Sequence, residues 1–284
     1  MAMTLSLRAL SPRRLGWKVS PLGVLAACVI VFWAAIAVIG PWIAPHPPGE
    51  IVDYDFFGPL SAQFPLGTDY LGRDMLSRVL AGARYTVGIS LAAVMLACTA
   101  GVVLGMTAAV IGGWTDTAIS RVLDAVSSIP SKLFGLVVVA AIGSSIPVLI
   151  AVLAVVYTPG SYRFARALAV NVNTMDYVTV ARARGERTGY LIRAEIMPNI
   201  LGPVLADMGL RFVFIVLMLS GLSFLGLGVQ PPNADWGSLV RENMGGLSFG
   251  APAVLVPSLA IATLTISVNL LIDNLPTRIR DRSE

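Results

Sequence analysis

Charged side chains are few in this chain of 284 residues, and they fall into sets that could carry function. The first set lies in the stretch LGTDYLGRD, which brings Asp69, Arg73 and Asp74 close together. Opposite charges at this spacing form ion pairs, and ion pairs fix one segment of a chain against another. We therefore predict that these three side chains tie an external loop to the ends of neighbouring helices, a structural role.

A second set consists of charges that interrupt long apolar stretches. Lys132 follows Pro130, and Asp207 and Arg211 lie four residues apart in an apolar run. A charge at membrane depth is costly unless it is paired or faces water, so such residues often mark a solute pathway. We predict that these three line a substrate pathway, with the alternative that Asp207 and Arg211 simply pair on one helix face.

Several kinds of chemistry are excluded by the residues that the chain lacks. The phosphate-binding pattern GxxxxGK[ST] does not occur, since Lys18 follows Trp17 and Lys132 follows Ser131. His46 is the single histidine and lies between prolines, so neither a Ser-His-Asp set nor a dense metal site is expected. The two cysteines lie inside apolar runs and predict no disulfide. We expect no catalytic residue, no metal and no cofactor on this chain.

The elements that position these residues are membrane helices. Hydrophobic residues make up 56% of the chain and charged residues 13%, whereas soluble domains carry about 25% charged residues. The apolar residues come in runs long enough to cross a bilayer. We predict an all-α polytopic membrane protein with about six transmembrane helices. The expected spans are 22–44, 87–111, 117–143, 146–162, 203–228 and 251–273, the fourth broken by Pro159 and Gly160.

The arginines and lysines predict the orientation of these spans. Residues 1–21 carry four basic residues and no acid, and 163–199 carry six arginines against three acids, so both are expected in the cytoplasm. An even number of spans then returns the tail, 276–284, to the same side. The expected external loops are 45–84, 143–146 and 229–250, and 85–275 forms a five-helix core. The concentration of basic residues on the cytoplasmic side, where they contact lipid headgroups, explains the net charge of +4. No nucleic-acid partner is needed to explain it.

One cytoplasmic stretch could contact a soluble partner. Residues 176–185 read DYVTVARARG, in which Val178, Ala181 and Ala183 give a short helix a small apolar side. Gly185 would break this helix, and Pro198 would stop a second helix before the fifth span. Such an amphipathic unit is suited to seat in a groove of another protein, and the alternative is a solvated basic loop.

The same stretch carries a resemblance to a known family. Thr179-Val180-Ala181, Gly185 and Glu195-Ile196-Met197-Pro198 follow the coupling motif of ABC importer permeases, E-A-A, Gly and I-x-L-P, with four substitutions. Three further blocks resemble the C-subunit kind of dipeptide, oligopeptide and nickel permease. These blocks are LGTDYLGRD at 66–74 with LSR at 76–78, SFLGLG at 223–228 with QPP at 230–232 and WG at 236–237, and NLL at 269–271 with Asp273.

The resemblance implies a type I ABC importer permease fold in a bacterial inner membrane, with both termini cytoplasmic, working by alternating access. It implies as partners a homologous second permease, two ABC ATPases that bind ATP and Mg, and an extracytoplasmic substrate-binding protein. Its ATPase-coupling residues would be Asp176, Tyr177, Thr179, Ala181, Arg182, Ala183, Gly185 and Pro198.

The role of Trp236 and the transported solute stay open at this stage. Trp236 would act either as an interface anchor, which is favoured, or as an external gate. Di- or oligopeptides are favoured as substrates, with nickel, opines or another small solute as the alternative. An ATP-independent secondary transporter or channel is the alternative of a different class, although no internal repeat supports it.

Overall fold

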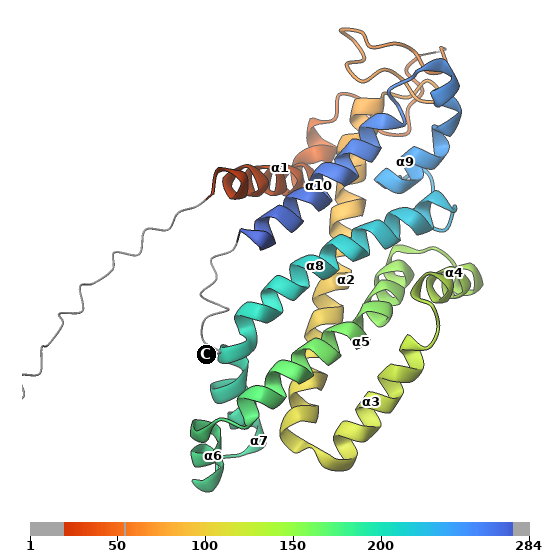
Figure 1. Cartoon of the computed structure of the whole chain (residues 1–284). Coiled ribbons are helices and arrows are strands. Elements are labelled where there is room, and N and C mark those ends of the chain that lie inside the picture. The colour runs from red at the N-terminus through yellow and green to blue at the C-terminus, as the bar shows by residue number, and fades with distance from the viewer. Residues whose placement is uncertain (1–19, 54, 275–284) are drawn as a thin grey trace, which may run out of the picture.

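The computed structural model describes residues 20–53 and 55–274, and it is built from helices (Figure 1). The predictions for the basic N-terminal segment and for the C-terminal tail concern residues that lie mostly or wholly outside these ranges. No β-strand occurs within them. Five helices are long and apolar enough to cross a membrane, and a bent helix pair raises the number of spans to six. The prediction of an all-α protein with about six spans is confirmed.

The helices follow one another with short connections. In chain order they are α1 (Pro21–Ile43), α2 (Met75–Ile111), α3 (Gly113–Ser127), α4 (Ser131–Ile142), α5 (Ile146–Asn173), α6 (Asp176–Ala183), α7 (Thr188–Tyr190), the π-helix η1 (Leu191–Ile196), α8 (Met197–Phe224), α9 (Trp236–Glu242), the 3₁₀-helix η2 (Met244–Phe249) and α10 (Leu255–Asp273). Helices α2, α5 and α8 form the long axis of the molecule, and α1 and α10 lie against its upper part in the view of Figure 1.

Helix α2 is longer than the span predicted at 87–111. Its 37 residues reach about 55 Å, well beyond the roughly 30 Å of a hydrocarbon core. Asp74 begins the helix by accepting hydrogen bonds from the backbone N–H groups of Leu76 and Ser77. The predicted loop 45–84 therefore ends at residue 74. The added turns of α2 are stabilised by burial against the segment that leads into α9, which a hydropathy pattern does not reveal.

Helices α2 and α5 make the most extensive helix contact of the described residues. A Cβ added at Gly101 would lie 2.6 Å from Cβ of Ser161, and one added at Gly105 would lie 2.8 Å from the backbone nitrogen of Arg166. Only glycine permits this approach, as the GxxxG spacing of the two residues indicates. Below and above this contact, aliphatic side chains of α2, α5 and α8 fill the core.

The third and fourth predicted spans differ from the structure in opposite ways. The stretch 117–143 is not one straight helix but a broken span, the pair α3 and α4, bent by 78° at Pro130, whose ring removes a backbone donor. The stretch 146–162 is not broken at Pro159, because α5 continues to Asn173. Gly160 serves close packing there, since an added Cβ would lie 2.5 Å from Nη1 of Arg211.

A cap covers one end of the bundle. It consists of the connection between α1 and α2 together with α9 and η2, and in Figure 1 it lies at the end opposite α6. The predicted loop 229–250 is therefore largely helical. Helix α8 begins at Met197, earlier than the predicted span at 203–228, and α10 begins at Leu255, later than predicted.

Candidate functional site

A buried charge cluster holds the cap on α2. Asp69 accepts from Nε of Arg73 at 2.7 Å and from Nη1 of Arg78 at 2.5 Å. Glu242, at the end of α9, accepts from the same two arginines at 3.1 and 2.9 Å. All four side chains are at least nine-tenths buried. We call these four residues the cap cluster. The predicted pairing of Asp69 with Arg73 is confirmed.

The cap cluster differs from the prediction in its membership. Asp74 belongs to the N-terminus of α2, where it also accepts from Oγ of Ser77 at 2.5 Å and lies 3.4 Å from Nδ1 of His46. Arg78 and Glu242 were missed by sequence reasoning. Arg78 was part of the recognised block but was given no role, whereas Glu242 is distant in sequence and carries no local signal.

Trp236 is not an interface anchor, because it is completely buried. Its indole Nε1–H donates to the carbonyl of Val79 at 3.0 Å, and its backbone N–H donates to Oγ1 of Thr86 at 3.0 Å. Its ring meets that of Trp33 edge to face, with 4.7 Å between centroids. The side chain therefore joins α9 to α2 and α1. Trp236 belongs to the WG block, which follows the QPP block. The hydrophobicity of this stretch alone could not show that the side chain is buried inside the cap.

Asp235 fixes the start of α9. Its carboxylate accepts from the backbone N–H of Ser238 at 2.7 Å, and the backbone N–H of Asp235 donates to the Ser238 hydroxyl in return. The hydroxyl of Ser223 donates to the other carboxylate oxygen of Asp235. Burial raises the pKa of the Asp235 carboxyl above its ordinary value, although these hydrogen bonds oppose the shift.

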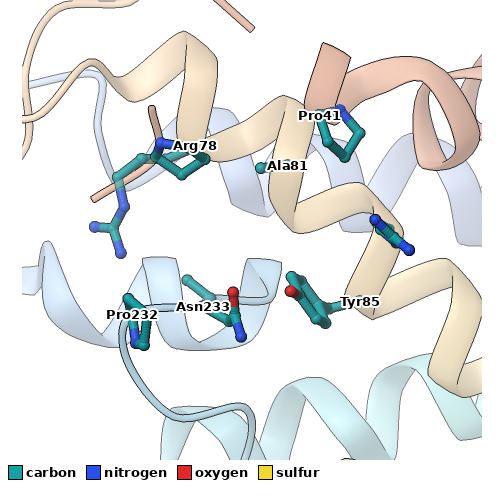
Figure 2. A pocket seen from close by; sticks show the side chains of 9 residues that line it. Pro41, Arg78, Ala81, Tyr85, Pro232 and Asn233 are labelled. Atoms are coloured by element: carbon teal, nitrogen blue, oxygen red, sulfur yellow. The ribbon is translucent and has the colours of Figure 1, made fainter. Parts of the chain in front are cut away.

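A cavity of about 170 Å³ lies beside the cap cluster, between α1, α2 and the segment before α9. Pro41 and Ala81 lie on one side of it and Pro232 and Asn233 on the other, with Arg78 and Tyr85 also in its lining (Figure 2). This cavity is too small for a peptide, and it marks a gap in the cap.

Helix α6 lies at the opposite end of the molecule and shows one side to its own chain. Val178 and Ala181 are buried and pack with Leu191 of η1. Ala183, which was grouped with them, is exposed. The small apolar side of α6 is therefore its attachment to the permease, not a surface for a partner as predicted. This follows from the i, i+3 spacing of Val178 and Ala181, which covers only one narrow stripe of the helix.

The remaining predicted residues of α6 lie on its free side. Asp176, Tyr177 and Thr179 are exposed, and Arg182 donates from Nη2 to Oδ1 of Asn173 at 2.9 Å. Gly185 has φ +83°, a left-handed conformation that glycine adopts without strain, and it ends the helix as predicted.

Pro198 does not stop the unit. It occupies the first turn of α8, which continues directly from η1. Proline is tolerated in the first turn because the N–H that it lacks would have no helical partner there. The segment from Thr188 onward is thus a continuous helical extension of α8.

The three predicted pathway residues lie on two helices, Lys132 on α4 and the other two on α8. Arg211 of α8 donates to Asp207 from Nε at 2.5 Å and from Nη2 at 2.9 Å, so these two residues pair with each other. Lys132 is exposed near the start of α4, and no ion pair among the described residues includes it. The structure does not bring Lys132 together with Asp207 and Arg211 in one site.

Two further ion pairs join α3 to α5 and were missed. Arg166 donates to both oxygens of Asp116 at 2.5 Å, and Nη1 of Arg163 lies 3.6 Å from Asp124. These arginines had been counted as part of a cytoplasmic loop because α5 was expected to end at residue 162. Within residues 20–53 and 55–274, no group of histidine, cysteine, aspartate and glutamate could hold a metal ion.

Residues 101–281 match the family described as the binding-protein-dependent transport system inner membrane component. This stretch contains α6, the exposed segment between two membrane helices. The chain belongs to this family. It is therefore a multi-span permease component of an ABC transport system of the inner membrane and not itself an ATP-hydrolysing enzyme.

Relatives extend this similarity over most of the chain. The chain is 34% identical to the di/tripeptide transport system permease protein DppC of Pseudomonas aeruginosa, over 89% of this chain and 84% of the relative. It is 33% identical to the dipeptide transport system permease protein DppC of Haemophilus influenzae, over 87% and 85%. It is 32% identical to the glutathione transport system permease protein GsiD of Escherichia coli, over 88% and 83%.

Proposed function

We propose that this permease forms one of two membrane-spanning halves of an ATP-driven importer of di- or oligopeptides. The relatives named for di/tripeptides, for dipeptides and for glutathione support a peptide as the solute. The observation that carries the mechanism is α6, a short helix anchored on one side to its own chain and exposed on the other.

The free side of α6 is suited to receive an ATPase. Tyr177 and Val180 are 43% and 48% exposed, and the neighbouring Met175 is also exposed. Exposed apolar side chains on a rigid helix gain free energy when a partner's groove covers them. Since η1 runs directly into α8, a displacement of α6 would be transmitted to a membrane span without loss in a flexible linker.

The partners and orientation follow from this assignment. In the proposal the α6 end and both termini face the cytoplasm, and the cap faces outward toward an extracytoplasmic substrate-binding protein. A homologous second permease completes the pathway, and lipids surround both. Two ABC ATPases bind ATP and Mg and drive alternating access, while this chain binds no cofactor. The Arg-rich sequence around α6 supports this orientation.

Substitution of Gly185 tests the proposal. Gly185→Val places a β-branched residue at φ +83°, so the connection between α6 and α7 must rearrange. We expect the assembled transporter to lose at least nine-tenths of its ATP-driven peptide uptake while the membrane helices stay folded. Gly189→Val is the matched control, because Gly189 has open space around an added Cβ and an ordinary backbone angle.

Purification gives an independent check of the same proposal. The chain should bring with it an ATPase that carries a phosphate-binding loop. A purified chain that moved peptide without an ATPase would support the alternative of a secondary transporter and would contradict the proposal. Transport of nickel or an opine but of no peptide would contradict the proposed substrate alone.

A further inference from the structure

The bend between α3 and α4 encloses a second cavity. Its volume is about 270 Å³, and its lining includes Ser127 at the end of α3, Ser131 at the start of α4 and Arg163 of α5. We call it the elbow cavity. Its size suits a terminal residue with its carboxylate better than a whole oligopeptide.

The elbow cavity lies at membrane depth. Arg163 follows 17 residues after Ile146, the first residue of α5, which corresponds to about 26 Å along the helix axis. A hydrocarbon core is about 30 Å thick, so the guanidinium lies in its inner part when α5 begins at the outer boundary. The side chains of Arg163 and Asp124 are nevertheless 54% and 64% exposed. Charges exposed this close to the inner boundary need contact with water or the interface, and we take this face to border the aqueous pathway.

Arg163 is the charged residue in the lining of the elbow cavity, and its side chain is exposed. Its Nη1 donates to Oγ of Ser127 at 3.1 Å. The same nitrogen lies 3.6 Å from Oδ1 of Asp124, which is a long contact between two exposed side chains. Such exposed pairs contribute little, about 0–1 kcal/mol, so a ligand carboxylate competes with Asp124 at small cost. Arg211 lies one turn away, against Gly160, but both Nε and Nη2 are already bound to Asp207.

The ends of the broken span add further polar groups at the elbow cavity. Ser131 contributes its hydroxyl, and no side chain caps the first N–H groups of α4. These groups are the positive end of a helix dipole, and they supplement the charge of Arg163. The Ser127 hydroxyl already donates to the carbonyl of Leu123, so the donors open to a ligand are Arg163 and Ser131. A guanidinium with one serine hydroxyl matches the geometry of a carboxylate better than that of a metal cation or an apolar solute.

We propose that the elbow cavity is a transient site for the C-terminal carboxylate of the transported peptide, with Arg163 as its specificity-determining cation. The inference rests on the proposed peptide import. It gives a reason why the transporter would prefer peptides with a free carboxylate. The permease would then contribute to this selectivity together with the binding protein.

Thiol protection tests whether the elbow cavity binds a carboxylate. The assembled transporter would carry Ile129→Cys in the cavity lining, with Cys28→Ala and Cys98→Ala to remove the native thiols. A water-soluble maleimide should modify Cys at position 129, alanyl-alanine at millimolar concentration should slow the reaction at least three-fold, and alanyl-alanine amide should not. The substitution Arg163→Gln should abolish the protection. A thiol that does not react, or equal protection by acid and amide, overturns the inference.

Uptake measurements separate this inference from the proposed function. With saturating loaded binding protein, Arg163→Gln should lower peptide uptake per ATP hydrolysed about ten-fold, and Arg163→Lys should recover part of it. Stimulation of ATP hydrolysis by the binding protein should persist, which a folding defect would not allow. Arg121→Gln is the charge-matched control, because Arg121 is exposed on α3 and lies outside the cavity lining. Normal peptide uptake by Arg163→Gln contradicts the inference alone, whereas no peptide uptake by the unmodified transporter contradicts the proposed function.

Discussion

The two ends of this permease are stabilised in different ways. At the cap, four charged side chains are buried together and each arginine contacts both acids. At the α6 end, a helix of eight residues rests on Val178 and Ala181 and leaves most of its side chains in contact with solvent. The cap is buried within one chain, whereas the α6 end leaves exposed the surface that we propose a partner covers.

The comparison shows where each end is sensitive to substitution. A buried charge network tolerates the loss of no member, because a charge left without its partner stays in a poorly solvated site. An exposed helix face tolerates polar substitutions in the isolated chain and fails only when binding is measured. Changes at the cap should therefore alter stability, and changes on the free side of α6 should alter assembly.

The largest effect is expected at Arg78. Arg78→Met would leave Asp69 and Glu242 with one arginine between them in a buried site. We expect a loss of about 3–5 kcal/mol of stability, measured by thermal or denaturant unfolding of the purified permease complex. Arg84→Met is the control, since Arg84 is exposed on the same helix and should change stability little. Equal stability of the two variants would remove the distinction between the cap and exposed charges.

A paired substitution in α6 sharpens the comparison at the other end. Val180→Asp places a charge on the free side, so we expect ATPase retention in pull-down experiments to fall about ten-fold, with unfolding unchanged within about 0.5 kcal/mol. Val178→Asp places the same charge in the buried contact with Leu191 and should destabilise the chain as well. If both variants lowered stability alike, α6 would have no free side.

The smallest effect concerns the pH dependence of the cap. Burial raises the pKa of Asp235, so the folded chain holds this proton more tightly than the unfolded chain does. The resulting stabilisation is complete below the ordinary carboxyl pKa of about 4 and is lost as the pH rises through the raised value. Asp235→Asn does not titrate, and its stability should depend less on pH over that window. A slope equal to that of the unmodified chain, from unfolding midpoints at several pH values, would contradict this assignment.

Sequence reasoning predicted which segments carry the function more reliably than it predicted the contacts of their side chains. The hydropathy pattern located every candidate span within residues 20–53 and 55–274, because the length and polarity of each run depend on the bilayer and not on neighbouring helices. It did not predict how Pro159 and Pro130 affect the helices around them. Pro159 lies within a continuous helix and Pro130 at a sharp bend, and a proline alone does not specify which outcome the surrounding helices will favour.

The same limit applies to the charged residues. Asp69 with Arg73, and Asp207 with Arg211, were predictable because pairs four residues apart meet through local geometry. The contacts of Glu242 with Arg78 and of Asp116 with Arg166 join segments distant in sequence. Nothing in the local pattern indicates that such residues will meet.

The sequence by itself determined that this chain crosses a membrane about six times and belongs with transport permeases, since both properties depend on local hydrophobicity and on short motifs. Only the tertiary structure decided which side of α6 is free, that Trp236 is buried, and that Arg163 borders a cavity at a bent span. These facts depend on packing between distant segments, where the free energy of burial is shared among side chains that no short pattern connects.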